Sequence, residues 1–420
     1  MSAQGPTEDL ASDNCESFPA HAERTIRTLR QAVGEIARAL PGARIRRPND
    51  LANVLGIDPK LAWRVSRVIQ CTDPFGAALH VPGRAGMRIL IDAAARHGAP
   101  PDVLNAAEQA YDQFSELVHV HGGDRRTFDM LISGYVKQDR RRGELHHRKL
   151  MFQGMSYVWG VQVRVQAVTT IVAPAADPTR LDAAVLKSYV DLRRIRPDVP
   201  WRITRTYRAD PQGEVETALI REPLDKTVAS GVEMPGLPLL TEFCSRPLPE
   251  CRRVVGPRGV VDYELVEGAV GNTACLTIAT GEVLRAVEPR YRAADHPTFN
   301  VDTILRTPAE LLMLDLLIRR DLWEPTMPSF SLYSDLFAEG LEWSRVECDR
   351  LPVHERVEYL GSGLDGLEAA EHPAYVPMLR HALERLGWDE AQFDAYRVKM
   401  SYPPIPSGSV MRCSLPTPPQ

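Results

Sequence analysis

The stretch NDLANVLGIDPKLAWRVSRVIQ, residues Asn49 to Gln70, decides how the N-terminal third of this chain folds. It predicts two short helices, at about 50–56 and 59–69, joined by a sharp turn. Gly56 suits the turn because glycine tolerates left-handed backbone, Asp58 can cap the second helix, and Pro59 fits its first position. Small and apolar residues stand where the helices would cross, at Ala52, Ile57, Ala62 and Val65.

The second predicted helix has two different faces. An apolar stripe for the core consists of Leu61, Val65, Val68 and Ile69. A basic face with one aromatic residue lies opposite, by the three-and-four spacing of a helix, and consists of Lys60, Trp63, Arg64 and Arg67. Such a face suits solvent or DNA.

This segment resembles the helix-turn-helix of bacterial transcriptional regulators, including the lac-repressor type, over the run Leu51 to Ile69. In those regulators the second helix enters the major groove of double-stranded DNA. The resemblance implies base-edge contacts from Asp58, Lys60, Trp63 and Arg64, and a phosphate contact from Arg67. Ala62 departs from the family, which more often has valine there, and Trp63 is bulkier than the usual small polar residue, so it could instead be a packing residue.

Further helices are predicted on both sides of this segment. Apolar residues at helical spacing indicate helices at Ala22–Leu40, Arg84–His97, Asp102–Val120 and Asp124–Tyr135. We therefore expect a disordered leader at 1–19 and an all-helical domain at 20–139. The basic run that follows breaks the periodicity and is interpreted as a linker at 140–150.

Beyond the linker the apolar pattern changes to that of an α+β domain with antiparallel strands, at 151–348. Alternating residues predict a strand at 157–166, and two later strands, at 273–280 and 283–288, would be joined by a turn at Gly281-Glu282. Further elements are predicted as a strand at 259–266, a helix from Asp177 to Arg194, and a helix over Leu311–Ile318 after the capping box that begins at Thr307. A helical C-terminal region at 349–420 would hold helices at Tyr375–Leu386 and Asp389–Val398, followed by an irregular tail.

Composition narrows the function classes. Apolar residues make up 44% and charged residues 25% of the chain, which is typical of globular proteins. No apolar run is long enough to span a membrane, and the polar N-terminus lacks the features of a signal peptide, so a cytoplasmic protein is expected. Seven scattered cysteines without a CxxC pair support neither a zinc site nor a disulfide framework.

Charge is unevenly distributed, although the net charge is only −5. Between His21 and Thr72 basic residues outnumber acidic ones by about six, which is the footprint of a surface that attracts phosphate. From Val301 onward acidic residues outnumber basic ones by about eight. A second basic stretch, interleaved with aromatics, includes Arg193, Arg194, Arg196 and Arg202; it could bind an anion or be an ordinary protein surface.

No catalytic residue, metal site or cofactor is predicted. The sequence holds no GxSxG, Walker, Rossmann or HExxH motif. His119, His121 and Asp124 have metal-like spacing, but two histidines that are two residues apart do not share a helix face. The leading hypothesis is a DNA-binding transcriptional regulator whose C-terminal domain oligomerises or senses a small-molecule effector. The alternatives are an assembly protein that uses the helical module for packing, and an enzyme of unassigned chemistry.

Overall fold

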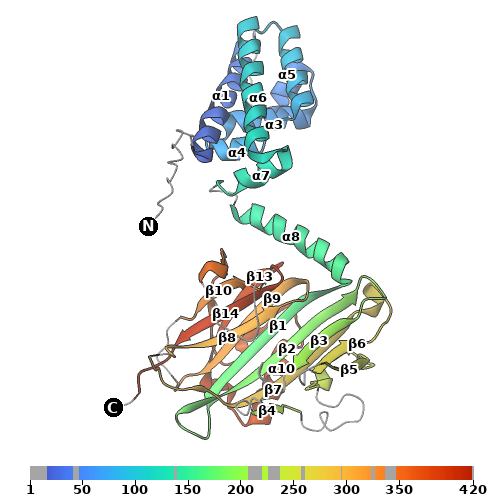
Figure 1. Ribbon diagram of the computed structural model, residues 1–420, viewed down its shortest axis with the longest axis vertical. Helices are drawn as coiled ribbons and strands as arrows, with labels where there is room; N and C mark the ends of the chain where they lie inside the picture. Colours follow the sequence, from blue (N-terminus) through green and yellow to red (C-terminus); the bar gives the residue numbers. More distant parts are fainter. Residues whose placement is uncertain are drawn as a thin grey trace, which may run out of the picture. The chain divides into compact units, whose positions relative to one another are not determined.

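The computed structural model describes residues 17–40, 47–136, 140–206, 220–225, 237–256, 261–294, 296–322, 327–335 and 347–418 (Figure 1). It is a mixed α/β structure that divides into two compact units, Met1–Glu144 and Leu145–Gln420. We call them the helical unit and the sheet unit. The predicted leader lies almost wholly outside the described residues, but Phe18 already begins the first helix.

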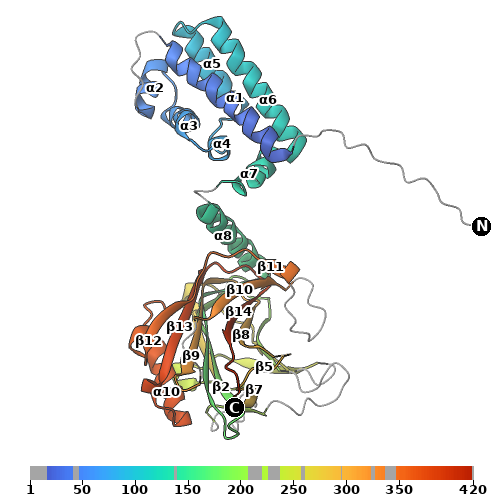
Figure 2. The same cartoon turned by 90° about the vertical axis from the view of Figure 1, so that its left-hand side faces the viewer.

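The described part of the helical unit consists of short and long helices around one core. Their bounds are α1 Phe18–Ala39, α2 Pro48–Leu55, α3 Pro59–Gln70, α4 Pro74–Ala78, α5 Arg84–Arg96, α6 Pro101–Gly122 and α7 Arg125–Ser133. The two long helices, α1 and α6, lie side by side (Figure 2). Ile26, Leu29 and Val33 of α1 share the buried core with Phe114 and Leu117 of α6. The helices predicted from apolar spacing are therefore confirmed in this unit.

Three sheets form the framework of the described part of the sheet unit. The largest has the strand order β12-β13-β9-β1-β2-β7-β4, and all its strand pairs are antiparallel except the parallel pair β1–β9. Its strands are β1 Val161–Pro174, β2 Arg180–Arg194, β4 Ile220–Pro223, β7 Leu276–Pro289, β9 Ala309–Arg319, β12 Glu358–Ser362 and β13 Phe393–Ser401.

The two smaller sheets are antiparallel throughout. The sheet of order β11-β10-β14-β8 contains β8 Thr298–Leu305, β10 Ser329–Ser334, β11 Arg350–Leu351 and β14 Ser407–Ser414. The sheet of order β3-β6-β5 contains β3 Trp201–Thr206, β5 Cys251–Val255 and β6 Val261–Leu265. Two helices, α8 Arg140–Trp159 and α10 Tyr375–Leu386, complete the longer described elements.

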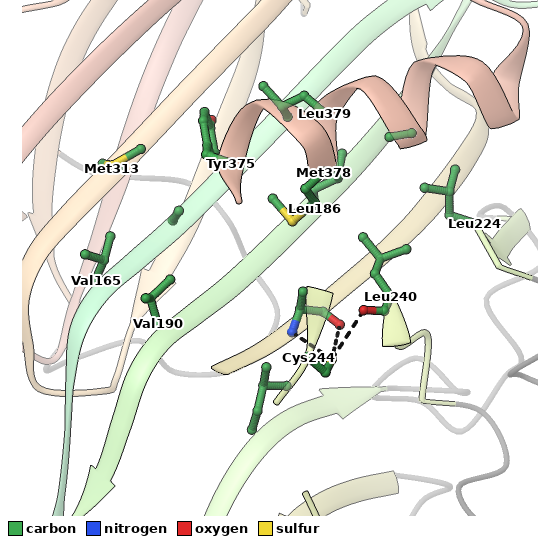
Figure 3. Packing of buried hydrophobic residues seen from close by; sticks show 14 of the residues in the cluster. Val165, Leu186, Val190, Leu224, Leu240, Cys244, Met313, Tyr375, Met378 and Leu379 are labelled. Carbon is green, nitrogen blue, oxygen red and sulfur yellow. Dashed lines mark hydrogen bonds between the residues drawn. The ribbon is translucent and has the colours of Figure 1, made fainter. Parts of the chain in front are cut away.

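The central strands of the large sheet are buried on both faces. On one face, Tyr375, Met378 and Leu379 of α10 pack in one cluster with Val165 and Leu186 of the central strands (Figure 3). A separate cluster brings together Val168 and Val172 of β1, Leu314 and Leu316 of β9, and Phe299 and Met411 of β8 and β14. Both sides of the central strands therefore exclude water.

This double burial explains where the sequence prediction of this region was wrong. The apolar run predicted as a helix at Leu311–Ile318 is strand β9, because a strand buried on both faces has a continuous apolar run and not an alternating one. The predicted helix at Asp177–Arg194 is mostly strand β2. Asp177 does accept the backbone N–H of Thr179, at 2.8 Å, but this bond makes a turn between two strands instead of a helix cap.

Other boundaries also differ from the prediction. The predicted basic linker at 140–150 is helical and belongs to α8, and that helix replaces the first residues of the strand predicted at 157–166. The predicted turn at Gly281-Glu282 lies inside the continuous strand β7. In the C-terminal region α10 has its predicted bounds, but the helix predicted at Asp389–Val398 is mostly strand β13, and β14 extends into the predicted irregular tail.

Candidate nucleic-acid interface

Helices α2 and α3 meet at the turn that the sequence predicted. Gly56 has φ 60° and ψ 36°, the left-handed conformation that glycine adopts without strain. The side chain of Asp58 accepts hydrogen bonds from the backbone N–H groups of Lys60, at 2.8 Å, and Leu61, at 3.3 Å, and so caps α3. The predicted crossing residues are all buried, namely Ala52, Ile57, Ala62 and Val65. The orientation of α3 is thereby fixed by its own sequence.

The solvent face of α3 is a stripe of polar and basic residues with one aromatic. The exposed residues Lys60, Trp63, Arg67 and Gln70 are spaced by three, four and three positions, so they share one side of the helix. Trp63 is 48% exposed, which is unusual for so large an apolar side chain. Asn49 and Asn53 are exposed on α2, and neither was singled out from the sequence. We call Lys60, Trp63, Arg67 and Gln70 the α3 stripe.

Arg64 does not belong to this stripe. Its side chain is half-buried, and its guanidinium donates to the backbone carbonyl of His80, at 3.3 Å, and to that of Val81, at 3.1 Å. These carbonyls lie in the loop between α4 and α5, so Arg64 ties that loop to α3. The prediction that Arg64 lies on a free basic face was therefore wrong. Backbone carbonyls leave no signal in the sequence that could have revealed this bond.

Trp63 contacts the same loop. The indole and the imidazole of His80 are arranged edge to face, with 5.4 Å between the ring centroids. The contact holds one side of the tryptophan ring while almost half of the side chain remains in solvent. Trp63 is thus oriented by the fold without being buried by it, and its exposed part can contact a ligand.

Charge in the helical unit is separated between elements. Helix α3 contains three basic residues, Lys60, Arg64 and Arg67, and no acidic one. Helix α6 has the opposite composition, with four acidic residues and no lysine or arginine; the acids are Asp102, Glu108, Asp112 and Glu116. A phosphate backbone is therefore attracted to α3 and repelled by α6.

The second basic stretch does not form a free cationic surface. Arg194 is 4% exposed and donates to the carbonyls of Val199, at 2.8 Å, and Leu265, at 2.9 Å, while burial lowers its pKa. The other three predicted residues also have partners: Arg193 with Asn272, Arg196 with Asp198, and Arg202 with Asp262. Arg194 thus joins the end of β2 to β6, and Arg202 of β3 pairs with Asp262 of the same strand β6.

The histidines with metal-like spacing lie on a helix. Helix α6 continues to Gly122, and His121 faces α1, where its Nε2 is 3.2 Å from Nδ1 of His21. Asp124 instead caps α7 by accepting the N–H of Thr127 at 2.9 Å, and this bond lowers its pKa. Among the described residues, no group of three or more His, Cys, Asp or Glu side chains could hold a metal ion. None of the helices searched in that part of the chain could span a membrane.

The sheet unit contains buried polar contacts that sequence reasoning missed. Oγ of Ser188 lies 2.9 Å from Nε2 of His372, a geometry typical of a nucleophile and its base. The two residues are only 1% and 2% exposed, so a substrate could reach them only if the core opened. Nearby, Tyr375 donates to Asp315 at 2.5 Å, and Arg397 donates to the same carboxylate. These bonds attach the start of α10 to the large sheet.

Comparisons with known proteins add little to this description. No protein-family profile matches the chain, and neither does any curated protein. A crystal structure of a "putative protease" from Parabacteroides distasonis ATCC 8503 aligns with a TM-score of 0.23 and 8% sequence identity. The alignment covers 61% of this chain and 41% of that one, so this chain spans about two fifths of the length of that protein. A TM-score this low carries no argument about fold or function.

Proposed function

We propose that this protein is a transcriptional regulator that binds double-stranded DNA through the α3 stripe. The observation that carries the proposal is the combination of a capped, rigidly packed helix with an outward face of Lys60, Trp63, Arg67 and Gln70. The major groove of B-DNA is about 12 Å wide and accepts one α-helix. A helix that presents cations and hydrogen-bond donors to this groove can contact both phosphates and base edges.

Three residues of the stripe have roles that follow from their chemistry and position. Lys60, in the first turn of α3, would donate to the acceptors of a guanine, and the exposed part of Trp63 would pack against a thymine methyl group. Arg67, one turn further along, would bind phosphate. Arg64 acts as a positioning residue, because its guanidinium holds the loop at His80 and Val81 against α3.

The sheet unit would then supply oligomerisation or the response to a small-molecule effector, and the protein would act in the cytoplasm. The rival function is an assembly protein in which α3 packs against another protein. The two functions differ in their dependence on nucleic acid. The α3 stripe binds DNA in a salt-dependent way if the first is right, and shows no affinity for DNA if the second is right.

Selection of genomic fragments by the full-length protein tests the proposal. The double variant Lys60→Ala/Arg67→Ala removes both cations of the stripe, and Arg88→Ala/Arg96→Ala removes two exposed cations of α5 as a charge-matched control. We expect wild type and control to enrich the same fragments and the stripe variant to enrich them much more weakly. Equal enrichment by all three proteins, or no enrichment by wild type, would refute the proposal.

A further inference from the structure

One side of helix α8 is attached to the sheet unit. Arg148 is buried and donates to Glu355, at 2.7 Å, and to the carbonyl of Ser401, at 3.1 Å. The ring of Phe152 lies 5.3 Å from that of Tyr402, and Met155 packs on a small core cluster that includes Leu312. Residues 148, 152 and 155 therefore define the inner side of α8.

The opposite side of α8 is exposed and carries no charged residue. It extends over about four turns and consists of His146, His147, Leu150, Gln153, Gly154, Tyr157 and Val158. We call these residues the α8 outer face. Tyr157 and Val158 are 68% and 62% exposed, and Leu150 is 43% exposed. A solvent face of a helix normally carries charges, so this composition is typical of an interaction surface.

Gly154 is a second sign of an interaction surface. Glycine is unfavourable in the interior of a helix, and Gly154 lies inside α8, more than one turn before its end at Trp159. A Cβ atom added there would meet no described atom within 4 Å. The same is true of Gly143, which lies about three turns earlier in the helix. Packing within the described part of the chain thus does not require either glycine. The close approach of another molecule to α8 would require residues this small.

We propose that the α8 outer face pairs with the same face of a second copy of this chain, in an antiparallel arrangement with the two-fold axis at Leu150. The argument is self-complementarity in size, which an interface between identical surfaces requires. Antiparallel pairing about residue 150 places Tyr157 opposite Gly143 of the second copy, and His146 opposite its Gly154. Leu150 meets its own equivalent. Tyr157 and His146 therefore each face a glycine of the second copy.

Charge favours the same arrangement. The basic residues Arg141 and Arg142 stand at the N-terminal end of α8, whereas residues 150–159 contain no charged side chain. In an antiparallel pair the two copies of Arg142 are about 24 Å apart along the helices, since a helix rises about 1.5 Å per residue. A parallel pair would bring them to the same level, where like charges repel.

Sedimentation equilibrium of the full-length protein tests the pairing. We expect a dimer at about 100 µM, well above the dissociation constant of a specific interface. Gly154→Leu separates association from folding, because leucine favours the helix but blocks the close approach of the second copy. This variant should have at least the helix content of wild type and bind its copy at least about tenfold more weakly. Tyr157→Ser should also weaken the dimer, whereas Tyr359→Ser, which changes a similarly exposed tyrosine on β12, should leave it intact.

Disulfide trapping tests the direction of the helices, in a Cys348→Ser background that removes an exposed thiol. Leu150→Cys should cross-link two copies. Tyr157→Cys should not, because its two copies are about 21 Å apart in the antiparallel pair. A monomeric wild type, an unaffected Gly154→Leu dimer, or equal cross-linking at both positions would overturn the proposal. None of these measurements involves DNA, so this proposal can fail while the proposed DNA binding holds, and the reverse.

Discussion

Replacing Arg64 by alanine should lower the stability of the helical unit by more than replacement of an exposed arginine would. The guanidinium makes two hydrogen bonds, at 3.3 and 3.1 Å, to carbonyls of the loop between α4 and α5. A bond from a charged donor stabilises a protein by about 1.5 to 3 kcal/mol when buried. Because Arg64 is half-buried, and because both bonds are longer than the usual distance, we expect about 1 kcal/mol from each. Arg64→Ala should therefore lower the free energy of unfolding by about 2 kcal/mol.

Two further variants show whether Arg64 stabilises the helical unit through its hydrogen-bond geometry or through its charge alone. Arg67→Ala removes the same charge from the exposed α3 stripe and should change the free energy of unfolding by less than about 0.5 kcal/mol. Arg64→Lys keeps the charge but has a single amine, which can reach one carbonyl at a time, so its stability should lie between those of wild type and Arg64→Ala.

Urea unfolding of the full-length protein, followed by circular dichroism at about 222 nm to report helix loss, measures these differences. Fragment binding is then measured for each variant under conditions where it is folded. If Arg64→Ala proves as stable as Arg67→Ala yet loses the wild-type sequence preference, Arg64 reads a base edge, and the positioning role argued from the structure is wrong.

Substitutions at Gly56, at the Asp315–Arg397 pair and at His372 test the fold. Gly56→Ala should cost about 1 kcal/mol from the left-handed backbone alone, because a Cβ there meets nothing within 4 Å in the described structure; a urea midpoint equal to wild type would contradict this. Asp315→Ala leaves the 4%-exposed Arg397 without its carboxylate and should cost about 3 to 5 kcal/mol in the sheet unit, measured by the same titration, whereas Asp315→Leu/Arg397→Met should recover much of the loss. Burial and the nearby Arg164 lower the pKa of His372 from 6.5 to about 4. As the pH falls, the imidazole is therefore protonated in the unfolded chain at a higher pH than in the folded protein. Stability should therefore decrease between about pH 6.5 and 4 by up to about 3 kcal/mol, and His372→Asn should remove that part of the pH dependence; an unchanged profile would contradict the assignment.

The helical unit was predictable because its signals are local. Asp58 caps its own helix, Gly56 makes its own turn, and the apolar residues of α1 and α3 recur at helical spacing. The buried and exposed sides of α3 follow from the same spacing. What could not be predicted was Arg64, because its partners are main-chain carbonyls of a loop that follows in the sequence.

The sheet unit was less predictable because its strands are defined by distant partners. Strand β9 pairs with β1 and β13, and burial on both faces removes the alternation that identifies a strand. The capping-box pattern at Thr307 then favoured a helix that tertiary contacts override. The first half of α8 was not predicted as a helix. Only a few of its residues, such as Arg148, contact the rest of the sheet unit, so the basic run Arg140–Lys149 shows no apolar stripe.

The salt dependence of DNA binding tests the central claim most directly. Binding of the full-length protein to a selected fragment is measured across a series of salt concentrations, for wild type, Lys60→Ala/Arg67→Ala and Arg88→Ala/Arg96→Ala. The logarithm of affinity falls with the logarithm of salt concentration by about 0.9 for each phosphate contact. A phosphate contact from Arg67 predicts that the stripe variant has a slope shallower by about 0.9, or by about 1.8 if Lys60 also binds phosphate, while the control keeps the wild-type slope. The same slope for all three proteins would contradict the assignment of α3 as the DNA-binding helix.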